Sequence, residues 1–268
     1  MPIRNDFVPG EFCWVDLTAH DLQAAAAWYG ELFGWSHMVM ESPEGAPPYA
    51  FFLKGEAGIA GLGQMSDEMK AQGIPPMWNS YINSADCEAT EAKAKELGAT
   101  VVVPTMEVPG QGKLAFFMDP EGASIAIWQS LSTEGPGLMV GEPGSLSWNE
   151  LMTRDTAKAK DFYKGLVGWD FMPMDMGGIE YNMIKNNDKD AGGMMAMDGP
   201  QFEGVPAHWL VYFAVEDCDA TSAKAAETGG KVMVPPTEIP VGKFSVLSDP
   251  QGGSFCLIQM SGTPECAE

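Results

Sequence analysis

Two carboxylates stand at matched places in a sequence that repeats itself. Asp16 lies in PGEFCWVDL and Glu150 lies in the related stretch PGSLSWNEL. A carboxylate held in an apolar cleft has a raised pKa and can serve as a general base. Tyr81 and Tyr212 are matched as well, and a tyrosine hydroxyl can donate to a developing oxyanion. The four residues are candidate proton-handling groups, and the alternative is that the carboxylates lie on a solvated rim.

Few other side chains are placed to react. Cys256 has no histidine or asparagine that can be placed next to it, which favours an inert core thiol over a nucleophile. His20 and His37 fall just outside expected helix ends, as surface residues do. His208 stands beside the strand that opens at Trp209 and is the best placed of the three histidines to contact a ligand.

The repeat extends beyond these residues and predicts the architecture. PGEFCWVDLTAHDLQAAAAWYGELFGW returns as PGSLSWNELMTRDTAKAKDFYKGLVGW, and WNSYINSADCEAT returns as WLVYFAVEDCDAT. DPEG at Asp119 returns as DPQG at Asp249, and the order Asp-Pro-x-Gly predicts a type I turn in a hairpin with an exposed carboxylate. Such long self-similarity indicates two homologous halves.

Each half divides again into two similar pieces. A strand leads to an aspartate that can cap a helix, at Asp21, Asp86, Asp155 or Asp217, and further strands follow each helix. A strand, a helix and three strands, used four times, predict an α+β fold with two curled, antiparallel-rich sheets and helices on one face.

Composition limits the possible partners and compartment. The 37 acidic residues outnumber the 15 basic ones, giving a net charge of −22 that repels phosphate backbones, so we expect no nucleic-acid partner. The N-terminus has no apolar signal core and no run reaches membrane-spanning length, so we expect no membrane partner and a cytoplasmic location. Five cysteines without CxxC spacing argue against a disulfide framework and a structural zinc site. A monomer or a homodimer is expected.

The segment 133–145 is rich in glycine and proline, which is typical of a linker. We therefore predict a first domain over 1–132 and a second over 146–268. The sequence leaves open whether the four modules pair within each half or between halves.

These motifs resemble the vicinal oxygen chelate superfamily, which includes glyoxalase I, bleomycin-resistance proteins and extradiol dioxygenases. The resemblance rests on the strand and Asp-capped helix, the aromatic-Tyr pair, the L-x-G-W motif and the later D-P-x-G. It covers 9–129 and 143–259 and is most similar to tandem, two-domain glyoxalase-like proteins. It implies that two βαβββ modules in each half curl a sheet into an open cleft where a ligand binds.

Metal-using relatives of this kind supply His, Gln or Glu from four strand positions. By resemblance, those positions hold Trp14, Gly61, Asn79 and Ala126 in the first half and Trp148, Gly193, Leu210 and Cys256 in the second. Small divalent metals require a converging set of imidazole nitrogens or carboxylate oxygens. We therefore expect neither a metal nor another cofactor.

With the register that the resemblance implies, alternate residues of each strand face the cleft. Phe12, Trp14 and Asp16 are expected there in the first half, and Leu146, Trp148 and Glu150 in the second. Asp16 and Glu150 are the catalytic candidates. The expected ligand-binding residues are Trp14, Asn79, Tyr81, Trp128, Trp148, His208, Tyr212 and Cys256. The two tryptophans could instead be core residues.

The function favoured by the sequence is capture of a small organic molecule in an aromatic cleft without a metal. One alternative is a glyoxalase-type lyase or isomerase that acts on an aldehyde-derived or aromatic substrate, with Asp16 or Glu150 as base. Another is an interaction protein with vestigial clefts. Lys113 and Lys243 are matched between the halves, and they either attract an anionic ligand or belong to surface turns.

Overall fold

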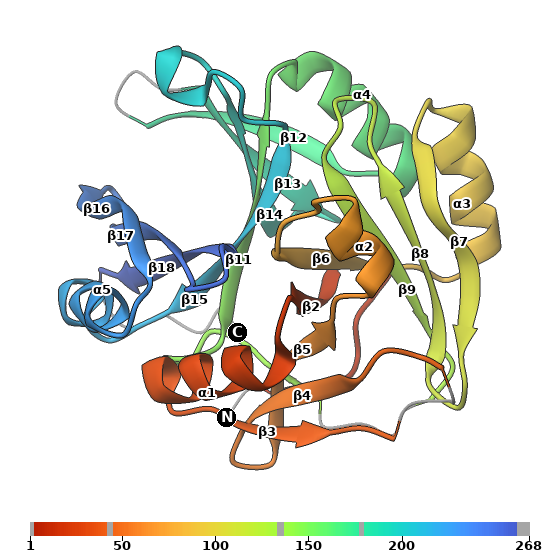
Figure 1. Cartoon of the computed structure of the whole chain (residues 1–268). Helices are drawn as coiled ribbons and strands as arrows, with labels where there is room; N and C mark the ends of the chain where they lie inside the picture. The colour runs from red at the N-terminus through yellow and green to blue at the C-terminus, as the bar shows by residue number, and fades with distance from the viewer. Residues whose placement is uncertain (1–2, 42–44, 133–136, 177–179, 262–268) are drawn as a thin grey trace.

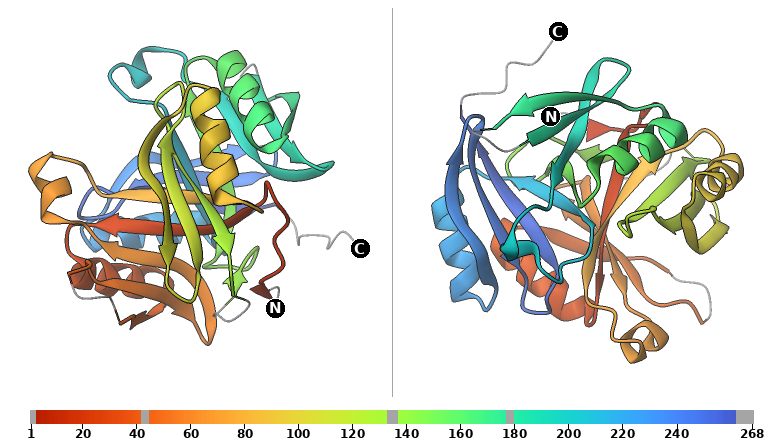
Figure 2. Two further views of the ribbon diagram at one scale, coloured as in Figure 1. Left: turned by 90° about the vertical axis from the view of Figure 1, so that its right-hand side faces the viewer. Right: turned by 90° about the horizontal axis from the view of Figure 1, so that it is seen from above.

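The computed structural model describes residues 3–41, 45–132, 137–176 and 180–261. Two sheets, one from each half of the chain, form the centre of the molecule, and helices lie beside them (Figure 1). Figure 2 shows this arrangement from two further directions. The predicted α+β class, with two tandem sets of strand-helix-strand modules, is confirmed.

The first half contains two βαβββ modules. The first module consists of β2 (Phe12–Ala19), α1 (Leu22–Phe33), β3 (Ser36–Val39), β4 (Tyr49–Lys54) and β5 (Ala57–Gln64). The second consists of β6 (Met77–Asn83), α3 (Cys87–Glu96), β7 (Thr100–Val108), β8 (Gly112–Met118) and β9 (Ser124–Ser130). The short elements β1 (Ile3–Arg4) and α2 (Asp67–Ala71) lie outside this pattern.

The second half repeats the same order. Its first module consists of β11 (Leu146–Thr153), α4 (Thr156–Val167), β12 (Asp170–Asp175), β13 (Glu180–Asn186) and β14 (Lys189–Ala196). Its second consists of β15 (His208–Ala214), α5 (Cys218–Glu227), β16 (Lys231–Ile239), β17 (Gly242–Ser248) and β18 (Ser254–Met260). The 3₁₀ helix η1 (Pro200–Phe202) lies between the modules.

The predicted caps delimit the helices. Asp21 lies just before α1 and its Oδ1 accepts from the backbone N–H of Ala24 at 2.9 Å, which satisfies a donor that has no partner inside the helix. Asp86, Asp155 and Asp217 do the same for α3, α4 and α5. Helix α1 ends at Gly34, whose φ of 74° is a left-handed conformation that favours glycine.

The modules pair within each half. The first strands of the two modules run antiparallel side by side, β2 beside β6 and β11 beside β15. In the second half the strand order is β12-β13-β14-β11-β15-β18-β17-β16, and the first half has the equivalent order from β3 to β7. The sequence leaves open whether the modules pair within each half or between halves, and the structure shows pairing within each half.

The helices, in contrast, pack across the halves. Helix α1 lies against α5 and α3 lies against α4 (Figure 1). One hydrophobic core lies between β2, β4 and β5 of the first half and β15, β17 and β18 of the second half. A second core lies between β6, β8 and β9 of the first half and α4, β11 and β14 of the second half. Each core is thus shared by the two halves.

The Asp-Pro-x-Gly motifs form the predicted turns, because Gly122 and Gly252 donate backbone hydrogen bonds to Asp119 and Asp249. The expectation of exposed carboxylates is wrong. Asp119 and Asp249 are each 4% exposed, and each accepts a hydrogen bond from a tyrosine of the other half.

A register shift changes the face of two predicted cleft residues. Between Phe12 and Trp14 on β2, one extra residue disturbs the pairing with β6, and the same shift lies between Leu146 and Trp148 on β11. Such a bulge breaks the simple alternation of side chains. Phe12 and Leu146 therefore pack into the cores shared by the halves instead of facing Trp14 and Trp148.

The segment predicted to be a linker carries a short strand. β10 (Leu138–Met139) lies between β1 and β5, and both of its residues are buried. Residues 133–136 lie outside the described residues, and the domain limits at 132 and 146 stay predictions. Among the described residues, no helix is long and apolar enough to cross a membrane.

Candidate functional site

Each sheet presents a face opposite its helices, and we call it the carboxylate face because Asp16 or Glu150 projects from it. On β2 the residues Val15 and Leu17 enter the helix-covered core, so alternation places Trp14 and Asp16 on the other side. Asp16 is paired with Asn79 on β6 and with Gly61 on β5. Three adjacent strands therefore form the floor around this carboxylate.

Asp16 is 6% exposed and accepts three hydrogen bonds. The Tyr81 hydroxyl donates to Oδ2 at 2.6 Å and the Asn79 amide donates to Oδ1 at 2.8 Å. The Tyr49 hydroxyl lies 3.4 Å from Oδ2 and accepts from Trp14 Nε1 at 3.3 Å. The structure thus brings together the predicted residues Trp14, Asn79 and Tyr81 around Asp16.

Burial dominates the acid-base properties of this group. Desolvation disfavours the charged form and raises the pKa of Asp16, while the hydrogen bonds from Tyr81, Asn79 and Tyr49 oppose the shift. The carboxylate in turn raises the pKa of Tyr81, which burial already raises. Asp16 is therefore a stronger proton acceptor than an exposed aspartate.

The second half carries a simpler version of the same cluster. Tyr212 donates to Glu150 Oε1 at 2.9 Å, and Trp148 Nε1 donates to the Tyr181 hydroxyl at 3.0 Å. Burial raises the pKa of the Glu150 carboxyl, and the neighbouring Tyr212 and Tyr181 oppose this shift. Leu210 is paired with Glu150 where Asn79 is paired with Asp16, so the second carboxylate lacks an amide donor.

Sequence reasoning missed Tyr49 and Tyr181. A Cβ added to Gly61 would lie 1.8 Å from the Tyr49 hydroxyl oxygen, and one on Gly193 would lie 1.7 Å from that of Tyr181. Each tyrosine therefore occupies the space that a side chain on the glycine would need. The repeat held the signal, because both tyrosines precede a glycine on the next strand at the same spacing.

The other predicted ligand-binding residues also lie on the carboxylate faces. Trp128 packs with Trp14 and Tyr81 in the first half. Cys256 is paired with Tyr212 and is fully buried, which raises the pKa of its thiol well above the ordinary value and makes it a poor nucleophile. His208 opens β15 and lies on the same face, beyond Leu210.

The residues at the superfamily's metal positions do not fit a divalent ion. Trp14, Gly61 and Ala126 offer no nitrogen or oxygen ligand, and the Asn79 amide is engaged by Asp16. In the second half only the buried Cys256 has a donor atom of a kind that binds metals. Within the described part of the chain, no three His, Cys, Asp or Glu side chains are grouped to hold a metal ion.

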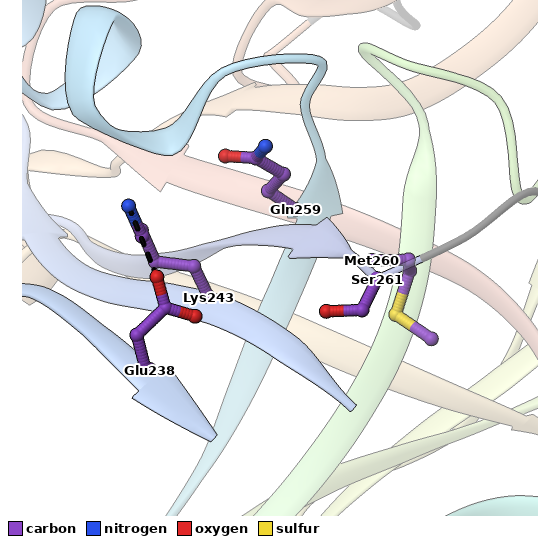
Figure 3. Close-up of a pocket in the computed structure, with 5 residues that line it drawn as sticks. All are labelled: Glu238, Lys243, Gln259, Met260 and Ser261. Atoms are coloured by element: carbon purple, nitrogen blue, oxygen red, sulfur yellow. Dashed lines mark ion pairs between the residues drawn. The ribbon is translucent and has the colours of Figure 1, made fainter. Parts of the chain in front are cut away.

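A separate cavity of about 330 Å³ lies near the ends of β16, β17 and β18, where Glu238, Lys243 and Gln259 line it (Figure 3). Lys243 is paired with Glu238 at 3.2 Å and with Asp219 of α5 at 2.7 Å. The matched Lys113 is paired with Glu88 at 2.6 Å. Both lysines are thus neutralised by nearby carboxylates, which does not favour capture of an anionic ligand.

Comparison with known families agrees with this geometry. The model of the glyoxalase/bleomycin resistance protein/dioxygenase superfamily matches residues 12–127 and 145–257. The chain belongs to this superfamily. The two matched segments correspond to the two sheets, so the resemblance expected from the repeated motifs is confirmed.

Two relatives within the superfamily are similar over nearly their whole length. A putative glyoxylase, CFP32 of Mycobacterium tuberculosis, is 40% identical over 262 residues, which are 97% of this chain and 98% of that protein. The anthracycline biosynthesis protein DnrV of Streptomyces peucetius is 33% identical over 274 residues, covering 97% of this chain and 98% of that protein.

Solved structures of the superfamily share the fold at low sequence identity. The Mn(II)-bound glyoxalase from Novosphingobium aromaticivorans has a TM-score of 0.63 at 15% identity and covers 94% of this chain and 82% of that one. The 2,3-dioxygenase LapB from Pseudomonas sp. KL28 has a TM-score of 0.63 at 13% identity, over 98% and 96% of the two chains.

Proposed function

We propose that the protein binds a small aromatic or carbonyl compound on its carboxylate faces, without a divalent metal at the superfamily's ligand positions. The observation that carries this proposal is that a tyrosine ring occupies the space next to the glycine at one of the superfamily's metal positions in each half. Tyr49 and Tyr181 fill the space over Gly61 and Gly193, and the Tyr49 hydroxyl donates to the adjacent Asp16 carboxylate. A protein hydrogen-bond donor therefore stands where metal-using relatives place a metal ligand.

The polar contacts suit a ligand that has an acceptor oxygen. The Tyr49 hydroxyl makes two long contacts, 3.4 Å to Asp16 and 3.3 Å to Trp14 Nε1. Long hydrogen bonds are weak, so redirecting this hydroxyl to a ligand carbonyl costs little. The Tyr81 hydroxyl, at 2.6 Å from Asp16, holds the carboxylate in place.

The apolar contacts suit a flat ligand. Trp14 and Trp128 are partly buried beside Phe116 on the first carboxylate face, and Trp14 packs edge-on against Phe51. Aromatic side chains offer a large apolar area together with a polar edge, which is typical of small-molecule sites. The names of the relatives, one a putative glyoxylase and one an anthracycline biosynthesis protein, support a small organic ligand.

The two faces differ in polarity. Asn79 and Thr18 lie around Asp16, whereas Leu210 and Met152 take the matched positions around Glu150. We infer that the first face receives the polar end of a ligand and that the second face favours a more apolar compound.

Catalysis by Asp16 or Glu150 is the second candidate function, and the raised pKa of both buried carboxyls favours it. In this scheme the carboxylate takes a proton from the carbon next to a carbonyl group. The electron pair of the broken C–H bond moves towards the carbonyl oxygen, where the Tyr49 or Tyr181 hydroxyl donates a hydrogen bond.

A fluorescence titration tests the binding proposal. EDTA-treated protein is titrated with a dihydroxyanthraquinone, a flat aromatic probe with carbonyl oxygens, and tryptophan emission is recorded. Saturable quenching is expected, with affinity lowered roughly tenfold in Tyr49→Phe or Tyr181→Phe, since each loses one hydrogen bond. Trp28→Phe, which changes a tryptophan buried on the helix side, should leave the affinity unchanged.

Binding that requires added Mn²⁺, or titrations in which both tyrosine variants match the parent, would contradict the proposal. Incubation with 1-tetralone in D2O, a ketone that has C–H bonds next to its carbonyl group, separates the two candidate functions by mass spectrometry. Deuterium incorporation that is lost in Asp16→Asn or Glu150→Gln, with binding retained, supports the catalytic one.

A further inference from the structure

Three methionines and a histidine lie on the second carboxylate face, beyond Glu150. Met152 on β11 is paired with Met195 on β14 and with His208 on β15. Residues paired on adjacent strands point to the same face, and adjacent strands lie about 4.8 Å apart. Met195, Met152 and His208 therefore form one row across three strands. Met197 follows directly after β14 and donates its backbone N–H to the Thr153 carbonyl at 2.8 Å.

The three methionines lie in one apolar cluster. Met152 and Met197 are each 3% exposed, and Met195 packs against them as a half-buried residue. Phe202 and Val205, from the segment that contains η1, pack against the same cluster. The thioether sulfurs of the three methionines are therefore largely shielded from water. Little water can reach a soft cation bound there.

His208 presents a free lone pair. Its Nδ1 lies 2.8 Å from the Pro206 carbonyl oxygen, which can only accept, so Nδ1 carries the proton of the neutral ring. No hydrogen-bond partner of Nε2 is found among the residues that the structure describes. A backbone carbonyl that fixes one ring nitrogen and leaves the other free is the usual arrangement of a metal-binding histidine.

We propose that Met152, Met195, Met197 and His208 form a site for a soft monovalent metal ion, Cu⁺. Thioether sulfur selects Cu⁺ and imidazole nitrogen also binds copper, whereas Mg²⁺, Ca²⁺ and Mn²⁺ prefer oxygen. The buried carboxyl of Glu150 lies two residues from Met152 along β11 and can balance the added charge.

The first half provides an internal control. In the first half, Thr18 stands at the position that corresponds to Met152. Thr18 is paired with Gly63, which corresponds to Met195, and with Met77, which corresponds to His208. Met65 matches Met197, because its backbone N–H donates to Ala19 as that of Met197 does to Thr153. This set has two thioethers and no imidazole, so we expect no Cu⁺ site in the first half.

The proposal is independent of the proposed function. It uses the row at Met152, whereas the superfamily's metal positions in this half are Trp148, Gly193, Leu210 and Cys256. A failure of Cu⁺ binding would leave the small-molecule proposal unaffected, and the reverse also holds.

The experiment is an anaerobic Cu⁺ titration of the full chain against bathocuproine disulfonate, a coloured competitor. Exposed thiols are first blocked with iodoacetamide, because thiolates bind Cu⁺ more tightly than thioethers. We expect one equivalent of Cu⁺ per chain. His208→Ala and Met197→Leu should each weaken binding by about tenfold or more. Met65→Leu, the matched change in the first half, should leave binding unchanged.

X-ray absorption at the copper edge supplies the second measurement, and sulfur together with nitrogen neighbours is expected. Circular dichroism confirms the fold of each variant, and Met→Leu nearly conserves volume. The proposal is overturned if the competitor retains all the Cu⁺, if His208→Ala and Met197→Leu bind as tightly as the parent, or if Met65→Leu causes the same loss.

Discussion

The hydroxyl of Tyr29, in the first helix, donates to Asp249 Oδ2 in the last hairpin at 3.0 Å, across 220 residues of sequence. The equivalent contact joins the second half to the first, since the Tyr163 hydroxyl donates to Asp119 Oδ2 at 3.0 Å. Each tyrosine hydroxyl also accepts from a buried tryptophan, Trp78 or Trp209. The tyrosines repeated in the two helices and the repeated D-P-x-G motifs therefore join the two halves.

The first prediction concerns these contacts. Tyr29→Phe should lower the free energy of unfolding by about 1–3 kcal/mol, because it leaves the buried Asp249 carboxylate with one donor fewer. Urea denaturation measures the effect. In a double-mutant cycle, Tyr29→Phe and Asp249→Asn should couple, whereas Tyr29→Phe and Asp119→Asn should be additive. Additivity in both cycles would mean that the contact does not contribute to stability.

The second prediction concerns pH. Burial raises the pKa of Asp16, so the folded state binds this proton more tightly than the unfolded state. The resulting stability is fully present below the unfolded carboxyl pKa, near roughly 4, and is lost as pH rises through the folded value. Asp16→Asn cannot titrate, so its stability relative to the parent should rise as the pH increases above about 4.

Denaturation of the parent and of Asp16→Asn at a series of pH values checks this expectation. Asp67→Asn, which changes an exposed side chain in α2, serves as the matched control for an altered net charge. A stability difference for Asp16→Asn that falls with rising pH would show that Asp16 is better stabilised as the anion in the folded state.

The third prediction concerns divalent metals. Elemental analysis of the purified protein should find no stoichiometric manganese, iron, nickel or zinc, since neither set of superfamily positions offers converging ligands. EDTA should leave the melting temperature unchanged, because a metal that does not bind cannot stabilise the fold. About one tightly held divalent ion per half would refute the account of both carboxylate faces.

The fourth prediction separates binding from folding at Trp148. Trp148→Ala should weaken binding of a dihydroxyanthraquinone by about 1–3 kcal/mol, the usual contribution of an aromatic anchor. Glu150→Gln should leave binding intact and abolish any turnover, because the amide keeps the shape and loses the base. If Trp148→Ala costs several kcal/mol of folding stability while ligand affinity stays unchanged, Trp148 is a core residue.

Much of the fold could be predicted because helix caps, turns and strand alternation are local. Asp21 and Asp155 each act within one helical turn, and alternation places Trp14 and Asp16 on one face. The limits of the strand after the first helix, β3, cannot be predicted from the sequence, since its residues are all exposed and carry no apolar alternation. The bulges that turn Phe12 and Leu146 away depend on pairing with the next strand, which a single segment does not reveal.

The candidate site could be predicted only in part, because some of its contacts depend on how neighbouring strands pack. Asp16, Asn79 and Tyr81 come from strands whose register the resemblance supplied, and the structure brings them together. Tyr49 and Tyr181 reach the carboxylates only because glycines on the neighbouring strand leave space for their rings. That complementarity is a tertiary property, although the matched spacing in the two halves hinted at it.

The most direct measurement is a crystal structure of the EDTA-treated protein soaked with a dihydroxyanthraquinone. The account predicts ring density against Trp14 or Trp148, with a carbonyl oxygen within hydrogen-bonding distance of the Tyr49 or Tyr181 hydroxyl. Density on another surface, with both carboxylate faces filled only by protein side chains, would contradict the account.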